Sequence, residues 1–534
     1  MEILREKIEN EIREFIQKEF KQEVDFFLEE SKDEKFGDYS TNLPFKLAKE
    51  LKRNPSEIGE LIANRLNSLS FIEQAKIEKG FLNIKVSQSA LADILRNIEK
   101  DPTEFGKSNF GSRKKVNLEF VSANPTGPLV VVNARAAAIG DSLKRIMNHC
   151  GYTVESEFYV NDAGGQIERL RKSIEARIKE IIGEPCEFPE DGYHGEYIYD
   201  IAREILKVES REDPGRFAVN YIHRWQKSTL EKFRVEFDRF VFETEIRASH
   251  YPPKMMRILE AKGLTYQEDG ATLFKSTLFG DDKDRVLIRS NGEPTYFFFD
   301  LAYHLHKIDR GYDILINIWG PDHHGYIPRM RAGLEALGFD VKNFTVLIAQ
   351  QVNLVRGNEK VKMSKRKGEI YSMDDLIEEV GTDAARFFFL TRTVNAHLDF
   401  DLELAKTIGV QNPVYYIQYS HARISSVLDY GLEKGLSLDH ADPFLLKEQE
   451  ERSIMRKIMY YPDVLQSICR TLEPHLLVRY LMELAELYHS YYQKIRIVSE
   501  SHELSKARLL LSFAVKTVVK NGLELIGVSA PERM

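Results

Sequence analysis

The fold of this chain is decided by the stretch Ser122-Ala123-Asn124-Pro125-Thr126-Gly127-Pro128-Leu129, which follows Val116-Asn117-Leu118-Glu119-Phe120. Segment 116–120 predicts a short buried strand. In the loop that follows, two prolines fix φ and a glycine frees it, so the chain turns sharply. Helical periodicity then runs from Ala134 to Met147. A strand, a tight loop and a helix N-terminus present backbone N–H groups to phosphate, so the stretch predicts a phosphate-binding loop.

The whole chain has the composition of an ordinary globular protein. It has 534 residues, of which 43% are hydrophobic and 30% charged, and its formal net charge is −8. This length predicts roughly three to four domains, each with its own core. Because the chain is acidic overall, any RNA-binding surface must be a local basic patch.

The cysteines and the apolar segments exclude several classes of protein. Cys150, Cys186 and Cys469 are few, far apart and odd in number, which argues against a disulfide framework and gives no zinc-ligand spacing. The N-terminus has the pattern of a charged amphipathic helix, not of a signal peptide. No apolar run approaches membrane-spanning length. We therefore expect a cytoplasmic protein with no protein-bound metal and no membrane partner.

Three domains are expected along the chain. Residues 1–110 predict a small α+β domain with strands around Gly80. Residues 111–400 alternate strands and helices, which predicts an α/β domain with a Rossmann-type doubly wound parallel sheet. Within it, residues 167–281 are expected to be an insertion, and strands of the nucleotide fold are expected to resume near 286–288. Residues 401–534 predict an all-α bundle.

The opening stretch, together with Asn133-Ala134-Arg135, resembles the ATP-binding signature of arginyl-tRNA synthetases, a family of class I aminoacyl-tRNA synthetases. The resemblance implies that ATP contacts the following residues: Ala123, Asn124, Pro125, Thr126, Gly127, Pro128, Leu129, Val130, Val131, Val132 and Asn133. It also implies a catalytic role for Asn133. Family members usually read His-Val-Gly-His or His-Val-Gly-Asn at positions 130–133, so this chain lacks the first histidine and the glycine.

A basic segment, Lys362-Met363-Ser364-Lys365-Arg366, lies in a loop flanked by glycines. Such a cluster alone is more often a solvated basic loop. It is similar, however, to the second class I signature, Lys-Met-Ser-Lys-Ser, with a final arginine. The resemblance implies that Lys365 stabilises the charge of the leaving pyrophosphate, with Lys362 and Ser364 in support and Met363 against ATP.

The segment Trp319-Gly320-Pro321-Asp322-His323-His324-Gly325-Tyr326 follows an apolar strand. Taken by itself it is a strand-ending turn with two ordinary histidines, and no third ligand supports zinc. The same segment occurs nearly unchanged in the family. The resemblance implies that Gly320, Asp322 and His323 lie against ATP, and that His323 also contacts arginine.

Tyr296 and Asp300 are four residues apart and share one face of a predicted helix. They could equally be a core tyrosine beside an exposed aspartate at a helix start. A guanidinium group is recognised by a planar carboxylate with neutral acceptors around it. The resemblance implies that both residues bind the guanidinium of arginine, and that Glu119 and Asn124 meet its ammonium and carboxylate groups.

Tyr415 and Tyr419 share a helix face at the start of the helical region. An aromatic stripe at this spacing is usually core, although tyrosines beside RNA can stack on unpaired bases. The resemblance to anticodon-binding bundles implies that Tyr415, Tyr419, Arg423 and Met534 contact tRNA. Phe81 and Asn83 match family positions at the tRNA elbow, while simple strand packing is the alternative for Phe81.

The resemblance implies an arginine–tRNA ligase. Its substrates would be L-arginine, tRNA(Arg), and ATP with Mg²⁺, and it would need no prosthetic group and no DNA. Arginyl-adenylate would form first, and arginine would then pass to the 2′-hydroxyl of the terminal adenosine. The family expectation is a monomer. One alternative is a paralogue that binds tRNA without efficient charging, because Val130 cannot donate a hydrogen bond and Val132 is β-branched where the family has glycine.

Overall fold

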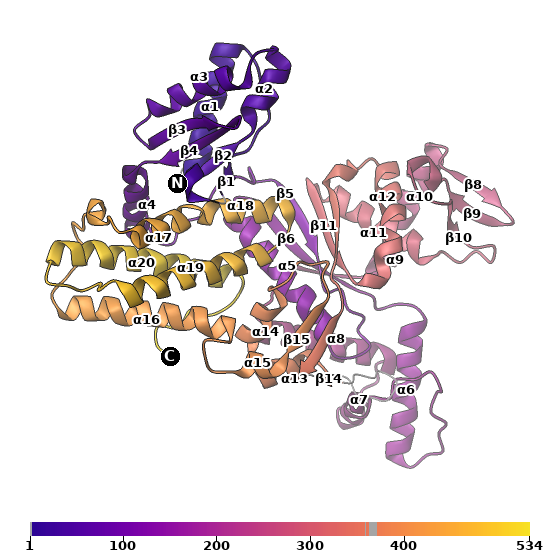
Figure 1. Ribbon diagram of the computed structural model, residues 1–534. Helices are drawn as coiled ribbons and strands as arrows, with labels where there is room; N and C mark the ends of the chain where they lie inside the picture. The colour runs from indigo at the N-terminus through magenta and orange to yellow at the C-terminus, as the bar shows by residue number, and fades with distance from the viewer. Residues whose placement is uncertain (1–2, 32, 358, 362–370) are drawn as a thin grey trace.

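The computed structural model describes residues 3–31, 33–357, 359–361 and 371–534. Figure 1 shows a central α/β region, from β5 to α15 (residues 115–406), with an N-terminal unit above it and a helical bundle to one side. Within the described ranges, no helix combines the length and the apolar character needed to cross a bilayer. Cys150, Cys186 and Cys469 are all free thiols.

The N-terminal unit is a four-stranded antiparallel sheet in the order β1-β2-β4-β3 with helices against it. The turn between β3 and β4 is Lys79-Gly80, where both residues have positive φ, and this confirms the strands expected around Gly80. The elements are α1 (Leu4–Phe20), β1 (Glu29–Glu30), β2 (Tyr39–Thr41), α2 (Leu43–Leu51), α3 (Pro55–Asn67), β3 (Ile72–Glu78), β4 (Phe81–Val86) and α4 (Gln88–Lys100).

The central region contains a five-stranded sheet in the order β12-β11-β5-β6-β7, and every neighbouring pair is parallel. The strands are β5 (Lys115–Glu119), β6 (Thr153–Val160), β7 (Arg239–Phe242), β11 (Ile314–Trp319) and β12 (Phe344–Ile348). The chain moves outward from β5 to β7 and then returns to β11 on the other side. This reversal beside β5 is the switch point at which doubly wound sheets bind ligands, beyond the carboxyl ends of the strands.

Helix α5 (Val131–His149) follows the opening stretch, as its periodicity predicts. Arg135 on this helix is fully buried. Its guanidinium donates to the carbonyl oxygens of Gln350, Ala396 and Thr393 at 2.8–2.9 Å. The arginine therefore connects the start of α5 to the chain at Gln350 and at residues 393–396.

The range 167–281 is not one insertion, contrary to the expectation. It contains β7, a strand of the central sheet, after the helices α6 (Gly165–Ile182), α7 (Glu196–Lys207) and α8 (Pro214–Lys232). Residues 286–288 also lie elsewhere than expected, in a separate antiparallel sheet of β8 (Thr265–Glu268), β9 (Ala271–Phe274) and β10 (Arg285–Ile288). Strands of four residues carry too little periodicity to be assigned to a sheet from sequence.

The central region contains further helices and short strands. They are α9 (Glu243–Ala248), α10 (Tyr251–Ala261), α11 (Tyr296–Asp309), the 3₁₀ helix η3 (Pro321–Tyr326), α12 (Ile327–Leu337), β13 (Val352–Arg356), β14 (Glu359–Lys360), α13 (Met373–Val380), α14 (Thr382–Phe389), β15 (Leu398–Asp401) and α15 (Leu402–Lys406). Figure 1 shows α6 with α7, and the small sheet β8–β10, as two projections from this region.

The helical bundle consists of α16 (Pro413–Glu433), α17 (Gln449–Met459), α18 (Tyr461–Thr471), α19 (His475–Lys494) and α20 (His502–Leu525). Helix α14 connects this bundle to the central region. Arg386 of α14 is fully buried and donates to Asp141 of α5 at 2.5 Å and to the carbonyl of Ile526 at 2.8 Å. Asp383, one turn earlier, accepts from the Gln418 amide at 2.9 Å.

Candidate active site and tRNA-contact surface

A cavity of about 1210 Å³ lies where β5 and β11 end, at the switch point of the sheet. The structure brings together in its wall most of the residues predicted to bind ATP or arginine: Glu119, Ala123, Asn124, Thr126, Gly127, Pro128, Val130, Val132, Asn133, Tyr296, Asp300, Gly320, Asp322 and His323. These positions come from β5, α5, α11 and η3, which are far apart in the sequence.

Three residues of the predicted ATP-binding stretch do not line this cavity. Leu129 and Val131 are 1% and 2% exposed and belong to the hydrophobic core, and Pro125 is also buried. Val130 and Val132, which alternate with them, do line the cavity. The side chains of Leu129 and Val131 therefore anchor the loop, and the predicted contact of these residues with ATP is left to their backbone atoms.

The backbone turns sharply where β5 ends. Val121 has φ 68° and Ser122 has φ 38°, and the Ser122 N–H donates to the Phe120 carbonyl at 2.9 Å. Positive φ is rare for a β-branched residue and costs on the order of 1–3 kcal/mol. The Ser122 hydroxyl donates to Glu119 at 3.0 Å and accepts from the Tyr159 N–H at 3.1 Å. Strain of this kind concentrates at functional sites, but residue type alone does not reveal it.

Side chains of helices α7 and α8 donate hydrogen bonds to the loop that follows β5. Gln226 of α8 is 1% exposed, and its amide donates to the carbonyls of Asn124 at 3.0 Å and Gly127 at 2.9 Å. The Tyr197 hydroxyl of α7 donates to the Thr126 carbonyl at 2.7 Å. A Cβ on Gly127 would lie 3.2 Å from that hydroxyl, so the glycine also makes room for it. Sequence reasoning missed both supports because they lie 71 to 102 residues from the loop.

The departure from the family signature falls on the first turn of α5. Val132 lies within the regular helix and has no positive φ, so this backbone accommodates its β-branched side chain. The Val130 N–H donates to the Asn133 side-chain oxygen at 2.9 Å. Val130 also forms a β-bridge with Ser372, and the Met373 N–H donates to the Leu129 carbonyl at 2.8 Å. The start of α5 is thus joined to the chain that follows the basic segment.

Asp300 and Tyr296 lie at the N-terminal end of α11, and both line the cavity. Tyr296 is 58% exposed, whereas Asp300 is half-buried, so the alternative of a core tyrosine beside an exposed aspartate is wrong. The Tyr326 hydroxyl of η3 donates to the Asp300 carboxylate. Burial raises the pKa of Asp300 to about 7, the hydrogen bond from Tyr326 lowers it, and the nearby charges of Glu243 and Glu119 raise it.

The described wall of the cavity is acidic. Its wall carries the carboxylates Glu119, Glu190, Asp191, Glu243, Asp300 and Asp322, and no lysine or arginine among the described residues. Lys362, Met363, Ser364 and Lys365 lie outside the described residues. In the parts of the chain that are described, no group of three His, Cys, Asp or Glu side chains could hold a metal ion. The cavity is therefore suited to a cation, and a polyphosphate bound there would need positive charge from elsewhere.

The pKa of Asp300 predicts how binding of a cation depends on pH. Below pH 7 the carboxyl is largely protonated, so kcat/KM for a guanidinium substrate should rise about tenfold from pH 6 to pH 8. Tyr326→Phe removes the hydrogen bond that lowers the pKa, so it should move the midpoint to higher pH. Steady-state kinetics across this range measure both effects. A flat profile, or a midpoint that moves down in the variant, would contradict the assignment.

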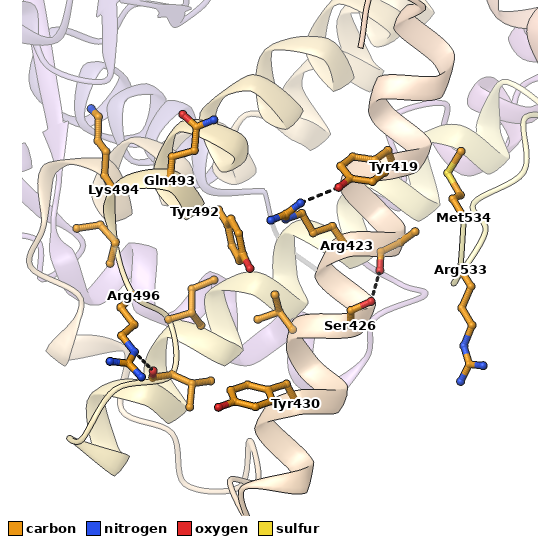
Figure 2. Close-up of a pocket in the computed structure, with 15 residues that line it drawn as sticks. Tyr419, Arg423, Ser426, Tyr430, Tyr492, Gln493, Lys494, Arg496, Arg533 and Met534 are labelled. Carbon is orange, nitrogen blue, oxygen red and sulfur yellow. Dashed lines mark hydrogen bonds between the residues drawn. The ribbon is translucent and has the colours of Figure 1, made fainter. Parts of the chain in front are cut away.

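A second cavity, of about 960 Å³, lies in the helical bundle (Figure 2). Of the predicted tRNA contacts, Tyr419, Arg423 and Met534 line it, and Tyr415 stacks on Tyr419 with ring centroids 6.1 Å apart. Arg423 donates to the Tyr419 hydroxyl at 2.7 Å and lies 4.4 Å from the centre of the Tyr492 ring. Both predicted tyrosines are half-buried, so they are not simple core residues.

The wall of this second cavity is basic and aromatic. It includes Arg423, Lys494, Arg496 and Arg533 with three tyrosines, and it has no aspartate or glutamate among the described residues. We call this surface the basic tyrosine patch. It is a local basic patch on an acidic chain, of the kind that a nucleic-acid partner requires. Tyr492, Lys494 and Arg496 were not predicted, because they join the patch only through the packing of α16 against α19 and the loop after it. Tyr430, on α16 itself, and Arg533 were not predicted either.

The two predicted tRNA contacts in the N-terminal unit differ in exposure. Phe81 is 46% exposed and meets Phe45 edge-on, with ring centroids 5.9 Å apart, so strand packing does not account for it. Asn83 is 5% exposed, and its amide donates to the Phe81 carbonyl at 3.3 Å. The Asn83 side chain is therefore buried and supports Phe81, and its contact with tRNA stays a prediction.

Three family models together match nearly the whole chain. They are the arginyl tRNA synthetase N terminal domain over residues 2–86, the tRNA synthetases class I (R), catalytic domain over 95–430, and the DALR anticodon binding domain over 417–534. The catalytic model alone covers more than half of the chain, and its range contains the whole acidic cavity.

Relatives and solved structures agree with these models. An arginine–tRNA ligase of Caldanaerobacter subterraneus is 43% identical over 96% of this chain and 94% of its own. One of Listeria monocytogenes is 43% identical over the same shares. The structure of Thermus thermophilus arginyl-tRNA synthetase has a TM-score of 0.81, covers all of both chains at 22% identity, and supports the fold. On this evidence the chain belongs to the arginyl-tRNA synthetase family of class I aminoacyl-tRNA synthetases.

Proposed function

We propose that this chain is an arginine–tRNA ligase, which joins L-arginine to tRNA(Arg) at the expense of ATP. The observation that carries the proposal is the acid-lined cavity at the switch point, whose wall includes both Asp300 and the phosphate-type loop. We place the reaction in the cytoplasm, where charged tRNA is used, and expect a monomer.

Arginine would enter this cavity with its guanidinium toward Asp300 and Tyr296. A planar guanidinium donates two parallel hydrogen bonds to one carboxylate, and this geometry excludes lysine. Glu119, at the end of β5, would face the ammonium group, and Asn124 the carboxylate. The substrate carboxylate would then point toward the loop and the start of α5.

ATP would bind as its Mg²⁺ complex between the loop and η3. The loop and the first turn of α5 offer backbone N–H groups, which favour negative charge at a helix N-terminus. Gly320 has no atom within 4 Å of the place where a Cβ would stand, so the wall is open there for a ribose or base. Asp322 and His323, which follow in η3, would contact the nucleotide.

In the first step, the arginine carboxylate attacks the α-phosphorus of ATP and pyrophosphate leaves. The protein contributes by placing the two substrates and stabilising charge that develops on the leaving group. We assign that stabilisation to Lys365, with Lys362 and Ser364. In the second step, the terminal 2′-hydroxyl of tRNA attacks the adenylate carbonyl and AMP leaves.

The tRNA would reach both ends of the molecule. Unpaired anticodon bases would stack on the basic tyrosine patch, where arginines can also neutralise phosphates. The exposed Phe81 ring would meet the elbow of the tRNA. The alternative of a poorly charging paralogue has no support in the relatives, and the regular helix at Val132 removes one of the reasons for it.

The test is ATP–pyrophosphate exchange with arginine, run with and without tRNA(Arg). We expect exchange that requires both arginine and tRNA, because activation in this family is expected to need bound tRNA. The same preparation should charge tRNA(Arg) with radioactive arginine and not with lysine. Tight tRNA binding without exchange or charging would favour the paralogue instead.

A further inference from the structure

A buried network of charges lies behind the acidic cavity. Lys307 of α11 is 0% exposed, and its ammonium nitrogen is 2.5 Å from Oε2 of Glu119 and 3.9 Å from Oε1 of Glu157. The same nitrogen lies 4.6 Å from the centre of the Tyr303 ring. Glu119, Glu157 and Tyr303 are themselves buried. A lysine this deeply buried is rare unless its charge is compensated.

The network is balanced in charge. The Tyr303 hydroxyl donates to Glu157 at 2.5 Å and is 3.3 Å from Oε2 of Glu119. Arg310 donates to the other oxygen of Glu157. Arg310 also pairs with Glu155 at 3.3 Å, and Glu155 pairs with Arg239, so three carboxylates are matched by three cations. Glu157 and Arg310 do not line the cavity, and neither does Lys307, whereas Glu119 and Tyr303 do.

The two oxygens of Glu119 have different surroundings. Oε2 is held from behind by Lys307 and Tyr303, and Oε1 accepts from the Ser122 hydroxyl at 3.0 Å. Ser122 belongs to the positive-φ turn that borders the cavity. A carboxylate oxygen can accept a second hydrogen bond, so Oε1 can still receive a donor from the cavity.

We propose that Lys307 is a positioning residue, which holds Glu119 in one orientation so that Oε1 receives the α-ammonium of arginine. The inference rests on the proposed function and adds to it the group that prepares the ammonium site. Glu119 is 6% exposed, so its orientation depends on the groups packed against it, and Lys307 contacts its Oε2 at 2.5 Å.

Helix α11 connects the two ends of the substrate in this scheme. Asp300 and Lys307 are seven residues apart, close to two turns, and so lie on the same side of the helix. One rigid element thereby fixes the guanidinium partner directly and the ammonium partner through Lys307. The separation between the two sites is then set by the helix and not by a loop.

The test compares arginine with 5-guanidino-2-hydroxypentanoate, an analogue that has a hydroxyl in place of the ammonium. Arginine KM and the inhibition constant of the analogue are measured in the exchange assay. Lys307→Met should raise the KM for arginine about 10- to 100-fold and change the inhibition constant of the analogue less than about threefold. Tyr303→Phe should act in the same direction with a smaller effect. Lys254→Met is the matched control, because Lys254 pairs with Asp309 on the outer side of α11.

The outcomes separate positioning from a purely structural role. Lys307 does not prepare the ammonium site if Lys307→Met raises the KM for arginine and the inhibition constant of the analogue by the same factor. The same holds if it changes neither. If that variant does not fold, Tyr303→Phe decides in the same way, since it removes only one hydroxyl. Wild-type exchange with arginine is measured first, and its absence would overturn the proposed function and this inference together. If the wild type shows exchange, but both variants keep its preference for arginine over the analogue, the inference is overturned and the proposed function stands.

Discussion

Asp300→Asn is expected to lower kcat/KM for arginine in pyrophosphate exchange by about 10³-fold. The substitution keeps the size of the side chain and an acceptor for Tyr326, and removes only the charge that faces the guanidinium. Loss of one partner of a desolvated charge pair typically costs about 2–5 kcal/mol, which brackets this loss. The effect should fall on arginine and leave the KM for ATP within about threefold of the wild type.

The matched control for this prediction is Asp309→Asn. Asp309 lies on the same helix, but pairs with Lys254 and does not line the cavity. It should leave the exchange rate within about twofold of wild type, as expected for an exposed ion pair. A loss of less than tenfold in Asp300→Asn, or an equal loss in both variants, would remove Asp300 from the arginine site.

Lys365→Met is expected to lower kcat for exchange by about 10²–10³-fold, with little change in the KM for arginine. The described wall of the cavity has no lysine or arginine, so the charge of the leaving pyrophosphate must be met by Mg²⁺ and by residues from elsewhere. Ser372, which follows Lys365 by seven residues in the sequence, forms a β-bridge with Val130 beside the loop. We propose on this short separation along the chain that Lys365 serves the site where phosphate charge develops.

Lys360→Met provides the comparison for Lys365→Met. Lys360 is an exposed lysine at the end of β14, five residues earlier in the same basic region. Lys360→Met should leave kcat unchanged. If the lysines of this segment acted only through their summed charge, Lys360→Met and Lys365→Met would lower kcat equally. Stopped-flow or single-turnover measurement of adenylate formation would show whether the chemical step is the one affected. A rise in the KM for arginine with normal kcat would assign Lys365 a different role.

The sequence predicted the parts of this structure that depend on local pattern. The strand at 116–119, the sharp loop and helix α5 are where proline, glycine and apolar periodicity indicate. The parallel sheet followed from the alternation of strands and helices. Asp300, at the start of α11, and His323, just after β11, line one cavity, as their motifs indicated.

The parts that were missed depend on contacts between distant segments. Gln226 supports the loop through a helix about a hundred residues away, and Lys307 faces Glu119 across 188 residues. Strand β7 is too short to be recognised without its neighbour β6. Leu129 was assigned to ATP because a motif is contiguous, whereas the loop turns this side chain into the core. Pattern identifies the motif, and only packing decides which of its side chains face the ligand.

The attachment of the helical bundle has a consequence for engineering tRNA specificity by recombination. Asp383 and Arg386 precede residue 400, yet they hold Gln418 and the carbonyl of Ile526. A hybrid spliced at position 401 would pair these groups with foreign neighbours and leave a buried arginine poorly matched. The natural crossover point therefore lies before α14, and the recipient must supply an aspartate at position 141 to receive Arg386.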